Sequence, residues 1–274
     1  MYGSPRSKAI VLLSHEPNEK GVAEMLRSTR ELMGYKLAAA DGPIGKVKDF
    51  LFDEAQWTVR WMVADTGDWL PKRKVLISPI SVGEPDWNAG LFPVRMTKQE
   101  VESAPGLGLD EPVSREYETR FFDQYGWPYY WGGAGVWGAA VAPASLFTRQ
   151  EKADRVGNTP EGGTHVLRST DEVMGYHIQA LDDEIGHVED FVIDDAPWTL
   201  RYMVVDTRNW LPGRKVLVAP DWIDAIQWAD RQVAVGLTRE VVKGSPEYHP
   251  SAPVNREYEE HLYDYYGRPV YWQR

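Results

Sequence analysis

Several carboxylates in this sequence are spaced closely enough to share acid–base or metal chemistry. Asp49 and Asp53 form one pair, and Asp190, Asp194 and Asp195 form a second group. Two neighbouring carboxylates can act as general acid and base or bind a cation. Each group also precedes a predicted tight turn, where aspartate side chains accept hydrogen bonds from backbone N–H groups. We therefore interpret these aspartates as turn residues and predict neither catalytic nor metal-binding residues.

A further carboxylate stands at the end of a predicted strand in each half of the chain. Asp65 follows Arg60 in the first half, and Asp206 follows Arg201 in the second half. A carboxylate and a guanidinium form strong charge-assisted hydrogen bonds, and breaking such a pair where it is buried costs stability without implying catalysis. We predict the structural ion pairs Arg60–Asp65 and Arg201–Asp206.

A tryptophan precedes an arginine by four residues at two places. Trp69 is followed by Arg73, and Trp210 by Arg214. Tryptophan and arginine are the residue types favoured at binding hot spots, so these four residues are a candidate interface. Because the pair occurs twice, a partner could be gripped at two points. The alternative is that each tryptophan covers the end of a barrel.

Two histidines could form a metal site. His177 and His187 should lie near one another across a hairpin, with Glu189 close by, and imidazole is a common zinc ligand. They take the places of Lys36 and Lys46 in the first half, so drift between basic surface residues is the interpretation we favour. No nucleophile triad or phosphate-binding loop can be assembled either. We predict no cofactor and no enzymatic activity.

The elements that must position these residues occur twice. Met33-Gly34-Tyr35 returns as Met174-Gly175-Tyr176, an offset of 141 residues (174 − 33) that continues without insertion to Trp131 and Trp272. Such self-similarity identifies a structural unit. Each repeat contains short strand-like runs separated by frequent turns, which predict a small β-barrel.

Helical character is confined to the end of each repeat. Threonine N-caps predict helices at Lys98–Glu102 and Arg239–Lys243. The tails Arg115–Tyr125 and Arg256–Tyr266 place apolar, mostly aromatic residues four apart, which predicts a short helix with one apolar stripe.

Composition limits the functions open to the chain. The 274 residues carry a formal net charge of −11, which opposes sequence-independent binding to phosphate backbones, so we predict no nucleic-acid partner. The count of 0 cysteines excludes disulfides and thiolate chemistry and fits a reducing compartment. The apolar run Ala9–Leu13 is too short for a signal-peptide core. We therefore expect a cytoplasmic protein.

The segment between the repeats begins Gly/Ala-rich and uncharged and ends charged. Its glycines and Pro143 leave its hydrophobicity too weak for a membrane span. We expect a flexible linker, with a helical hairpin or an interfacial anchor as alternatives. The predicted organisation is an N-terminal extension at 1–25, a barrel domain at 26–131, a linker at 132–165 and a barrel domain at 166–274.

The repeated motif resembles the PRC-barrel family. The resemblance rests on Met33-Gly34-Tyr35, Ile44-Gly45 and Met62-Val63 with Asp65, and on the same residues 141 positions later. This barrel is shared by the cytoplasmic part of the H subunit of purple-bacterial photosynthetic reaction centres and the C-terminal half of a ribosome maturation factor. The resemblance implies small β-barrels that serve as protein-docking modules and have no common active site.

We therefore predict a mainly β fold of two tandem, pseudo-symmetric PRC-type barrels, each followed by a short helix. The function we predict is that of a non-enzymatic docking or scaffold protein with a protein partner of unknown identity, and self-association into a homo-oligomer is an option. One alternative implied by the resemblance is a peripheral, H-subunit-like component of a membrane photosynthetic or electron-transfer complex. The other alternative is a small-ligand or metal-binding protein.

Overall fold

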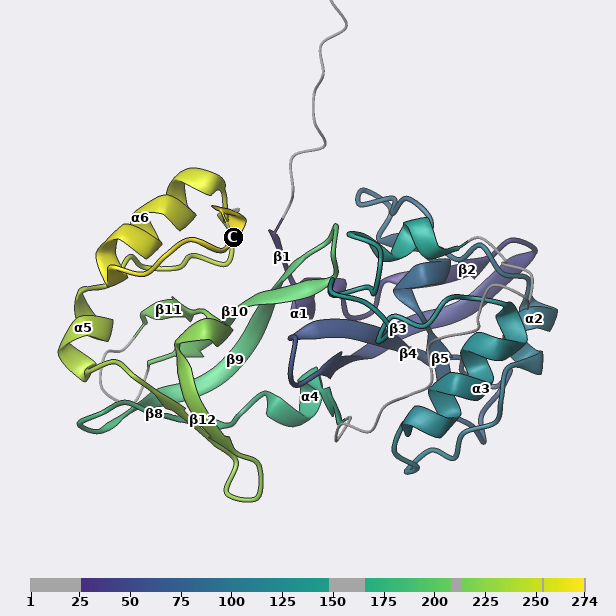
Figure 1. Cartoon of the computed structure of the whole chain (residues 1–274), viewed down its shortest axis with the longest axis horizontal. Helices are drawn as coiled ribbons and strands as arrows, with labels where there is room; N and C mark the ends of the chain where they lie inside the picture. The colour runs from purple at the N-terminus through teal and green to yellow at the C-terminus, as the bar shows by residue number, and fades with distance from the viewer. Residues whose placement is uncertain (1–25, 148–165, 208–212, 253, 274) are drawn as a thin grey trace, which may run out of the picture.

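The computed structural model describes residues 26–147, 166–207, 213–252 and 254–273, and these residues form a mainly β fold (Figure 1). The elements of the first repeat are β1 (Leu26–Ser28), α1 (Thr29–Leu32), β2 (Lys36–Ala39), β3 (Gly42–Asp53), β4 (Thr58–Asp65), β5 (Val75–Ile77), β6 (Leu91–Pro93), α2 (Lys98–Ser103) and α3 (Arg115–Tyr125). The elements of the second repeat are β7 (Leu167–Ser169), α4 (Thr170–Val173), β8 (His177–Gln179), β9 (Glu184–Asp194), β10 (Thr199–Asp206), β11 (Lys215–Val218), β12 (Ile223–Gln227), β13 (Gln232–Val235), α5 (Arg239–Gly244) and α6 (Arg256–Tyr266).

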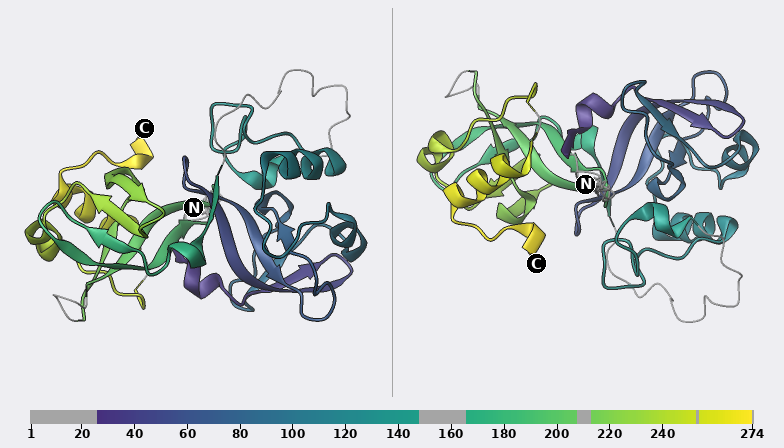
Figure 2. Two further views of the ribbon diagram at one scale, coloured as in Figure 1. Left: turned by 90° about the horizontal axis from the view of Figure 1, so that it is seen from below. Right: turned by 90° about the horizontal axis from the view of Figure 1, so that it is seen from above.

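The described strands form one 13-stranded sheet that is not closed. Its path runs β12-β13-β8-β9-β10-β4-β3-β2-β6, and the four remaining strands pair with members of this path. The repeats meet where Thr58 of β4 lies opposite Thr199 of β10. Figures 1 and 2 show the repeats as two lobes on either side of these shared strands. We expected a separate barrel in each repeat, whereas the described strands of both repeats share one open sheet.

The opening strand of each repeat pairs with the other repeat. β1 lies antiparallel to β9, with Leu26 opposite Asp194. β7 lies antiparallel to β3, with Leu167 opposite Asp53. The exchange is reciprocal, so each repeat supplies one strand that the other needs. The strand pattern of the sequence predicted β3 and β9, but it predicted neither the opening strands β1 and β7 nor their partners.

The hairpin of each repeat requires glycine at one crowded position. Gly45 in β3 has φ +156°, and a Cβ atom there would collide with the backbone carbonyl oxygen of Asp65. Gly186 in β9 stands in the same relation to Asp206, with φ +137°. Only glycine tolerates both the positive φ and the close approach of the neighbouring backbone. The glycine of the repeated Ile-Gly dipeptide is therefore explained by the geometry of the hairpin.

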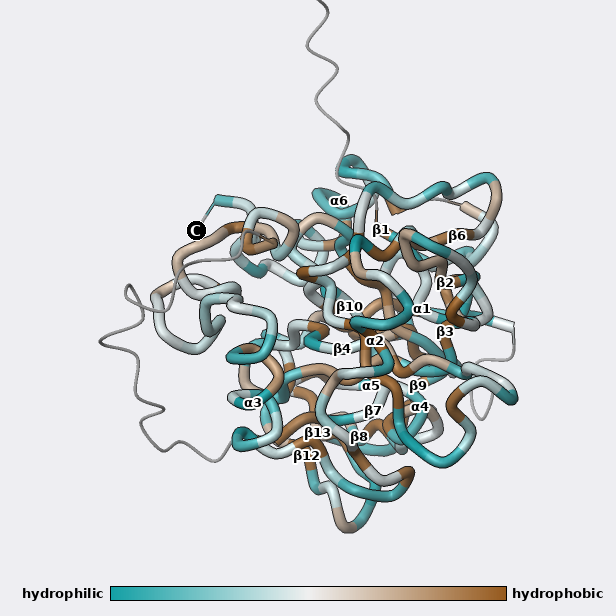
Figure 3. Tube along the Cα trace, turned by 90° about the vertical axis from the view of Figure 1, so that its right-hand side faces the viewer, coloured by the Kyte–Doolittle hydropathy of each residue, from teal (hydrophilic) through white to brown (hydrophobic). Residues whose placement is uncertain are grey.

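The C-terminal helices cover the sheet with an apolar face, as predicted. In α3 the side chains of Tyr117, Phe121 and Tyr125 are buried, and the ring of Phe121 meets that of Trp61 edge-on at 4.7 Å between centroids. Both α3 and α6 span the predicted residues and end at a left-handed glycine. Figure 3 shows that many of the hydrophobic segments lie in the strands.

Residues 132–147 pack against the first repeat instead of forming a free linker. Trp137 is fully buried there. Arg95 of the first repeat donates to the carbonyl of Ala144 (3.2 Å), and its guanidinium lies 4.0 Å from the ring centroid of Phe147. Residues 148–165 of the predicted linker lie outside the described residues. No helix in the described part of the chain is both long enough and apolar enough to cross a membrane.

The strand exchange predicts the behaviour of the first repeat alone. Residues 26–147 would lack β7, but their own β1 carries the same Leu-Arg-Ser-Thr sequence and could pair with β3 of a second molecule. We expect this half-chain to form a symmetric dimer, measured by size-exclusion chromatography with light scattering. The variant Asp49→Ala, which removes the carboxylate next to the exchanged strand, should weaken the dimer. A folded monomer of residues 26–147 would contradict the prediction.

Candidate functional site at the junction of the repeats

The candidate interface residues of the first repeat contact their own repeat. Arg73 donates from Nη1 to the carbonyl of Glu102 (2.8 Å) and from Nη2 to that of Ala104 (3.0 Å). These carbonyls end α2, so the guanidinium stabilises the C-terminus of this helix. Trp69 is half-buried against the core, with the ammonium group of Lys98 at 4.6 Å from its ring centroid.

The second repeat uses its arginine in the same way. Arg214 donates from Nη2 to the carbonyl of Ser245 at the end of α5. Trp210 lies outside the described residues. Both arginines therefore hold helix ends in place, and a docking role for Trp69 and Trp210 stays a prediction.

Arg60 pairs with a different carboxylate from the one that we predicted. Its Nη2 lies 3.4 Å from Oδ2 of Asp53. Asp65, five residues further along the strand, accepts a hydrogen bond from the N–H of Gly67 instead (3.1 Å). Residues five apart in a strand point to opposite faces of the sheet, which is why the expected Arg60–Asp65 pair is wrong.

The second repeat shows the same correction. Arg201 donates from Nε and Nη2 to Oδ2 of Asp194, at 3.0 and 2.8 Å. Asp206 is buried at the far end of the strand, so the expected Arg201–Asp206 pair is wrong for the same reason. Asp194 also accepts from the N–H of Ala196 (3.3 Å), which confirms the turn role predicted for this aspartate.

Asp49 joins the first repeat to the second. Its carboxylate accepts hydrogen bonds from Ser169 Oγ (2.5 Å), Thr170 Oγ1 (2.9 Å) and the N–H of Asp171 (3.1 Å). It also accepts from the N–H of Phe50 in its own strand (2.7 Å). The turn role that we predicted for Asp49 is therefore wrong, because most of its donors come from the exchanged segment.

Asp190 makes the reciprocal connection. It accepts from Ser28 Oγ, from Thr29 Oγ1 (2.9 Å), from the N–H of Arg30 (3.0 Å) and from that of Phe191 (2.7 Å). The turn role predicted for Asp190 is wrong as well. We call these two constellations, Asp49 with Ser169-Thr170 and Asp190 with Ser28-Thr29, the inter-repeat latches.

The latches are partly desolvated. Burial raises the pKa of Asp49 above its ordinary value of 3.8, although the hydroxyl groups of Ser169 and Thr170 and two backbone N–H groups act in the opposite direction. Removing a carboxylate from water is costly unless hydrogen bonds replace the lost hydration. The four donors around Asp49 provide that replacement, so this carboxylate has a structural task.

An arginine flanks each latch and contacts both repeats. Arg27 in β1 forms an ion pair with Asp195 of the second repeat (3.2 Å), and its guanidinium lies 3.5 Å from the ring centroid of Trp87 in the first. In the other exchange, Arg168 of β7 forms an ion pair with Glu54 (2.9 Å). Its guanidinium lies 3.9 Å from the ring centroid of Trp228. A cation that stacks on an aromatic ring while paired with a carboxylate fixes the position of the exchanged strand.

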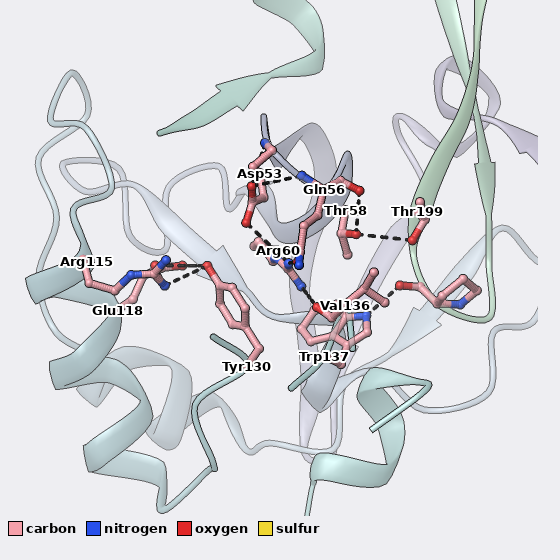
Figure 4. Close-up of polar contacts among 12 residues, drawn as sticks. Asp53, Gln56, Thr58, Arg60, Arg115, Glu118, Tyr130, Val136, Trp137 and Thr199 are labelled. Carbon is pink, nitrogen blue, oxygen red and sulfur yellow. Dashed lines mark hydrogen bonds and ion pairs between the residues drawn. The ribbon is translucent and has the colours of Figure 1, made fainter. Parts of the chain in front are cut away.

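Trp137 occupies a closed socket beside the junction (Figure 4). Its indole Nε1 donates to the carbonyl of Pro197 in the second repeat (2.6 Å). The guanidinium of Arg60 lies 4.9 Å from the Trp137 ring and 3.9 Å from the Tyr130 ring, and its Nη1 donates to the carbonyl of Val136. The Arg60 side chain is 0% exposed, and burial lowers its pKa. We call Arg60, Tyr130 and Pro197 the Trp137 socket.

An open cleft of about 310 Å³ lies at the corresponding place in the second repeat. It is bounded by the turn between β3 and β4, by the segment that follows the first repeat, and by β10 and the C-terminal segment of the second repeat. The lining residues that matter for its chemistry are Ala55, Gln56, Trp57, Val136, Arg201 and Tyr271. The sequence contained the 141-residue offset that relates cleft and socket, but nothing in it indicated where Trp137 packs.

Each repeat also has a buried glutamate in its C-terminal helix, Glu118 in α3 and Glu259 in α6. Glu118 accepts from Trp61 Nε1 (2.9 Å), Tyr130 Oη (3.0 Å) and Arg115 Nη1 (2.8 Å) (Figure 4 shows the last two). Because three donors converge on one buried carboxylate, this cluster fixes the helix to the strand. Sequence reasoning missed Glu118, whose position in an acidic helix resembles that of a solvent-facing residue.

Glu259 is the counterpart of Glu118. It accepts from Tyr202 Oη (2.7 Å) and Tyr271 Oη (2.9 Å), and Arg256 lies 3.1 Å away. Burial raises its pKa above the ordinary 4.5, and the two hydroxyl groups and Arg256 offset only part of this effect. Tyr271 also lines the cleft, so Glu259 holds one wall of it.

The two histidines considered for a metal site do lie near each other, as predicted. His177 in β8 is opposite His187 in β9, and His177 Nδ1 is 3.1 Å from Glu184 Oε1. Among the described residues, however, no group of three or more histidine, aspartate or glutamate side chains could hold a metal ion.

The latches predict a loss of stability when either carboxylate is removed. We expect Asp49→Ala and Asp190→Ala each to lower the free energy of unfolding by about 1–3 kcal/mol, because donors that are mostly partly buried lose their acceptor. Urea unfolding followed by circular dichroism measures this. The control is Lys48→Ala, an exposed neighbour in the same strand, which should change little. Equal stability of all three variants would refute the role of the latches.

Glu259 predicts a pH dependence. Because its pKa is raised in the folded state, its contribution to stability is largest below pH 4.5 and falls as the pH rises through the raised pKa. Glutamine does not ionise, so Glu259→Gln should lose no stability through this titration. We therefore expect the melting temperature of Glu259→Gln to fall less between pH 4.5 and 8 than that of the unmodified protein. Glu260→Gln, an exposed neighbour, is the control. If the melting temperatures of Glu259→Gln and the unmodified protein change equally with pH across this range, the predicted effect of Glu259 is wrong.

Comparison with known proteins leaves the family open. No protein-family model matches the chain, and no curated protein is significantly similar to it. The resemblance to PRC-barrels stays a prediction, and the function has to be argued from the junction of the repeats.

Proposed function

We propose that this chain is a non-enzymatic docking or scaffold protein built from two PRC-barrel-type repeats. The observation that carries the proposal is the cleft at the junction, whose lining includes a partly exposed arginine and several aromatic residues. Trp57, Arg201 and Tyr271 line it, and tryptophan, tyrosine and arginine are the residue types most often found at binding hot spots. The latches join the two repeats that supply the lining residues, and a preorganised site loses less entropy on binding.

The carboxylates that could do acid–base chemistry have structural partners, which favours a binding role over catalysis. Asp49 and Asp190 accept donors from the exchanged segments, and Glu118 and Glu259 accept donors beneath the C-terminal helices. A general base must reach the proton that it abstracts. These four carboxylates are engaged with donors that hold the fold together, so the proposal assigns them to architecture.

Small-ligand binding is the second candidate function. The volume of about 310 Å³ lies at the lower end of the range for small-molecule pockets. The cleft also combines apolar rings with a few polar groups, as such pockets do. Docking is favoured because the corresponding place in the first repeat is filled by a segment of polypeptide.

The test is capture of partner proteins from the native cells, followed by calorimetry of the purified partner with the purified chain. Ala55→Arg blocks the cleft from an exposed turn, and Ala196→Arg places the same side chain at the position 141 residues later, outside the cleft. We expect the first variant to lose at least about tenfold in affinity, or 1.4 kcal/mol, and the second to bind normally. A partner that binds both variants equally would contradict docking at this cleft, and a small molecule that alone raises the melting temperature would favour the second candidate.

A further inference from the structure

The partners of Trp137 have counterparts around the cleft. Trp137 contacts Arg60, Tyr130 and Pro197. The residues 141 positions later or earlier in the other repeat are, in the same order, Arg201, Tyr271 and Gln56, and all three line the cleft.

The ring–cation geometry is also the same in both places. The guanidinium carbon of Arg60 lies 3.9 Å from the Tyr130 centroid, and that of Arg201 lies 4.0 Å from the Tyr271 centroid. The backbone around the turn is shared as well, because Trp57 and Trp198 both have positive φ angles, 53° and 58°. The wall of the cleft therefore reproduces the wall of the Trp137 socket.

The two arginines differ in how their donors are used. Arg60 is 0% exposed, and its Nη1 donates to the carbonyl of Val136, the residue before Trp137. Arg201 is 23% exposed, and both Nε and Nη2 donate to Asp194. Its Nη1 donates to no described residue. Nη1 of Arg201 could therefore donate to a backbone carbonyl of a chain segment in the cleft, as Nη1 of Arg60 donates to that of Val136.

We propose that the cleft binds a tryptophan-bearing segment of another protein, with glycines close to the tryptophan on both sides. The inference rests on the proposed docking function and specifies the partner. The indole lies against Tyr271 and Arg201, and its N–H donates to the carbonyl of Gln56, as Trp137 donates to Pro197. The carbonyl before the tryptophan accepts from Nη1 of Arg201.

The requirement for nearby glycines follows from the segment around Trp137. A Cβ atom at Gly133 would collide with the backbone of Gly138, and Gly138 itself has φ +70°. The tight turn around Trp137 is thus possible only because glycines surround it. A partner that presents its tryptophan in the same way needs glycine at the same places.

The test uses a peptide with the sequence of residues 133–142, GAGVWGAAVA, carrying lysines at one end for solubility and a fluorescent label. Fluorescence anisotropy measures its binding to the full chain. We expect saturable binding to the unmodified protein and to Ala196→Arg, and at least about tenfold weaker binding to Ala55→Arg. A peptide with alanine in place of tryptophan should bind at least about tenfold more weakly.

Arg201→Lys tests the donor separately, since lysine keeps the charge but lacks the planar group that stacks on Tyr271 and the free Nη1. We expect weaker peptide binding by a protein that circular dichroism shows to be folded. Absence of peptide binding, or equal binding to Ala55→Arg, would overturn the inference. If the captured partner binds in the cleft while the tryptophan peptide does not, the proposed docking function stands and the inference that the partner presents a tryptophan is wrong.

Discussion

The structure depends on two largely desolvated carboxylates that accept hydrogen bonds from a distant part of the chain. Asp49 and Asp190 each receive two hydroxyl donors and a backbone N–H from the opening segment of the other repeat. A buried carboxylate without such donors would be strongly unfavourable. The exchanged strands are therefore held by more than sheet pairing.

Duplication supplied the symmetry of the molecule, and one segment breaks it. Residues 132–147 fill the Trp137 socket in the first repeat, where Arg60 is fully enclosed. In the second repeat, Arg201 stays accessible in an open cleft. The same types of side chain thus form core in one repeat and line an open cleft in the other.

Much of the local structure could be predicted from the sequence, because it is set by short-range rules. Threonine caps and left-handed glycines placed α2, α3, α5 and α6 within a residue or so, and turn residues bounded the long hairpins. The partners of β1 and β7 could not be predicted, since a Leu-Arg-Ser-Thr segment fits either repeat equally well. Asp49 was misassigned for the same reason: the turn that follows it is visible in the sequence, whereas its donors lie about 120 residues away.

The reciprocal exchange also governs how the protein can be made. The edge of β3 is completed only when Leu167–Ser169 arrives, and Asp49 and Ser169 are 120 residues apart. During synthesis that separation corresponds to a delay on the order of ten seconds. Through this interval the ribosome carries a half-built sheet with an unpaired edge, the kind of surface on which nascent chains aggregate. Duplication within one polypeptide limits that exposure, because the missing strand follows on the same chain and need not be found by diffusion.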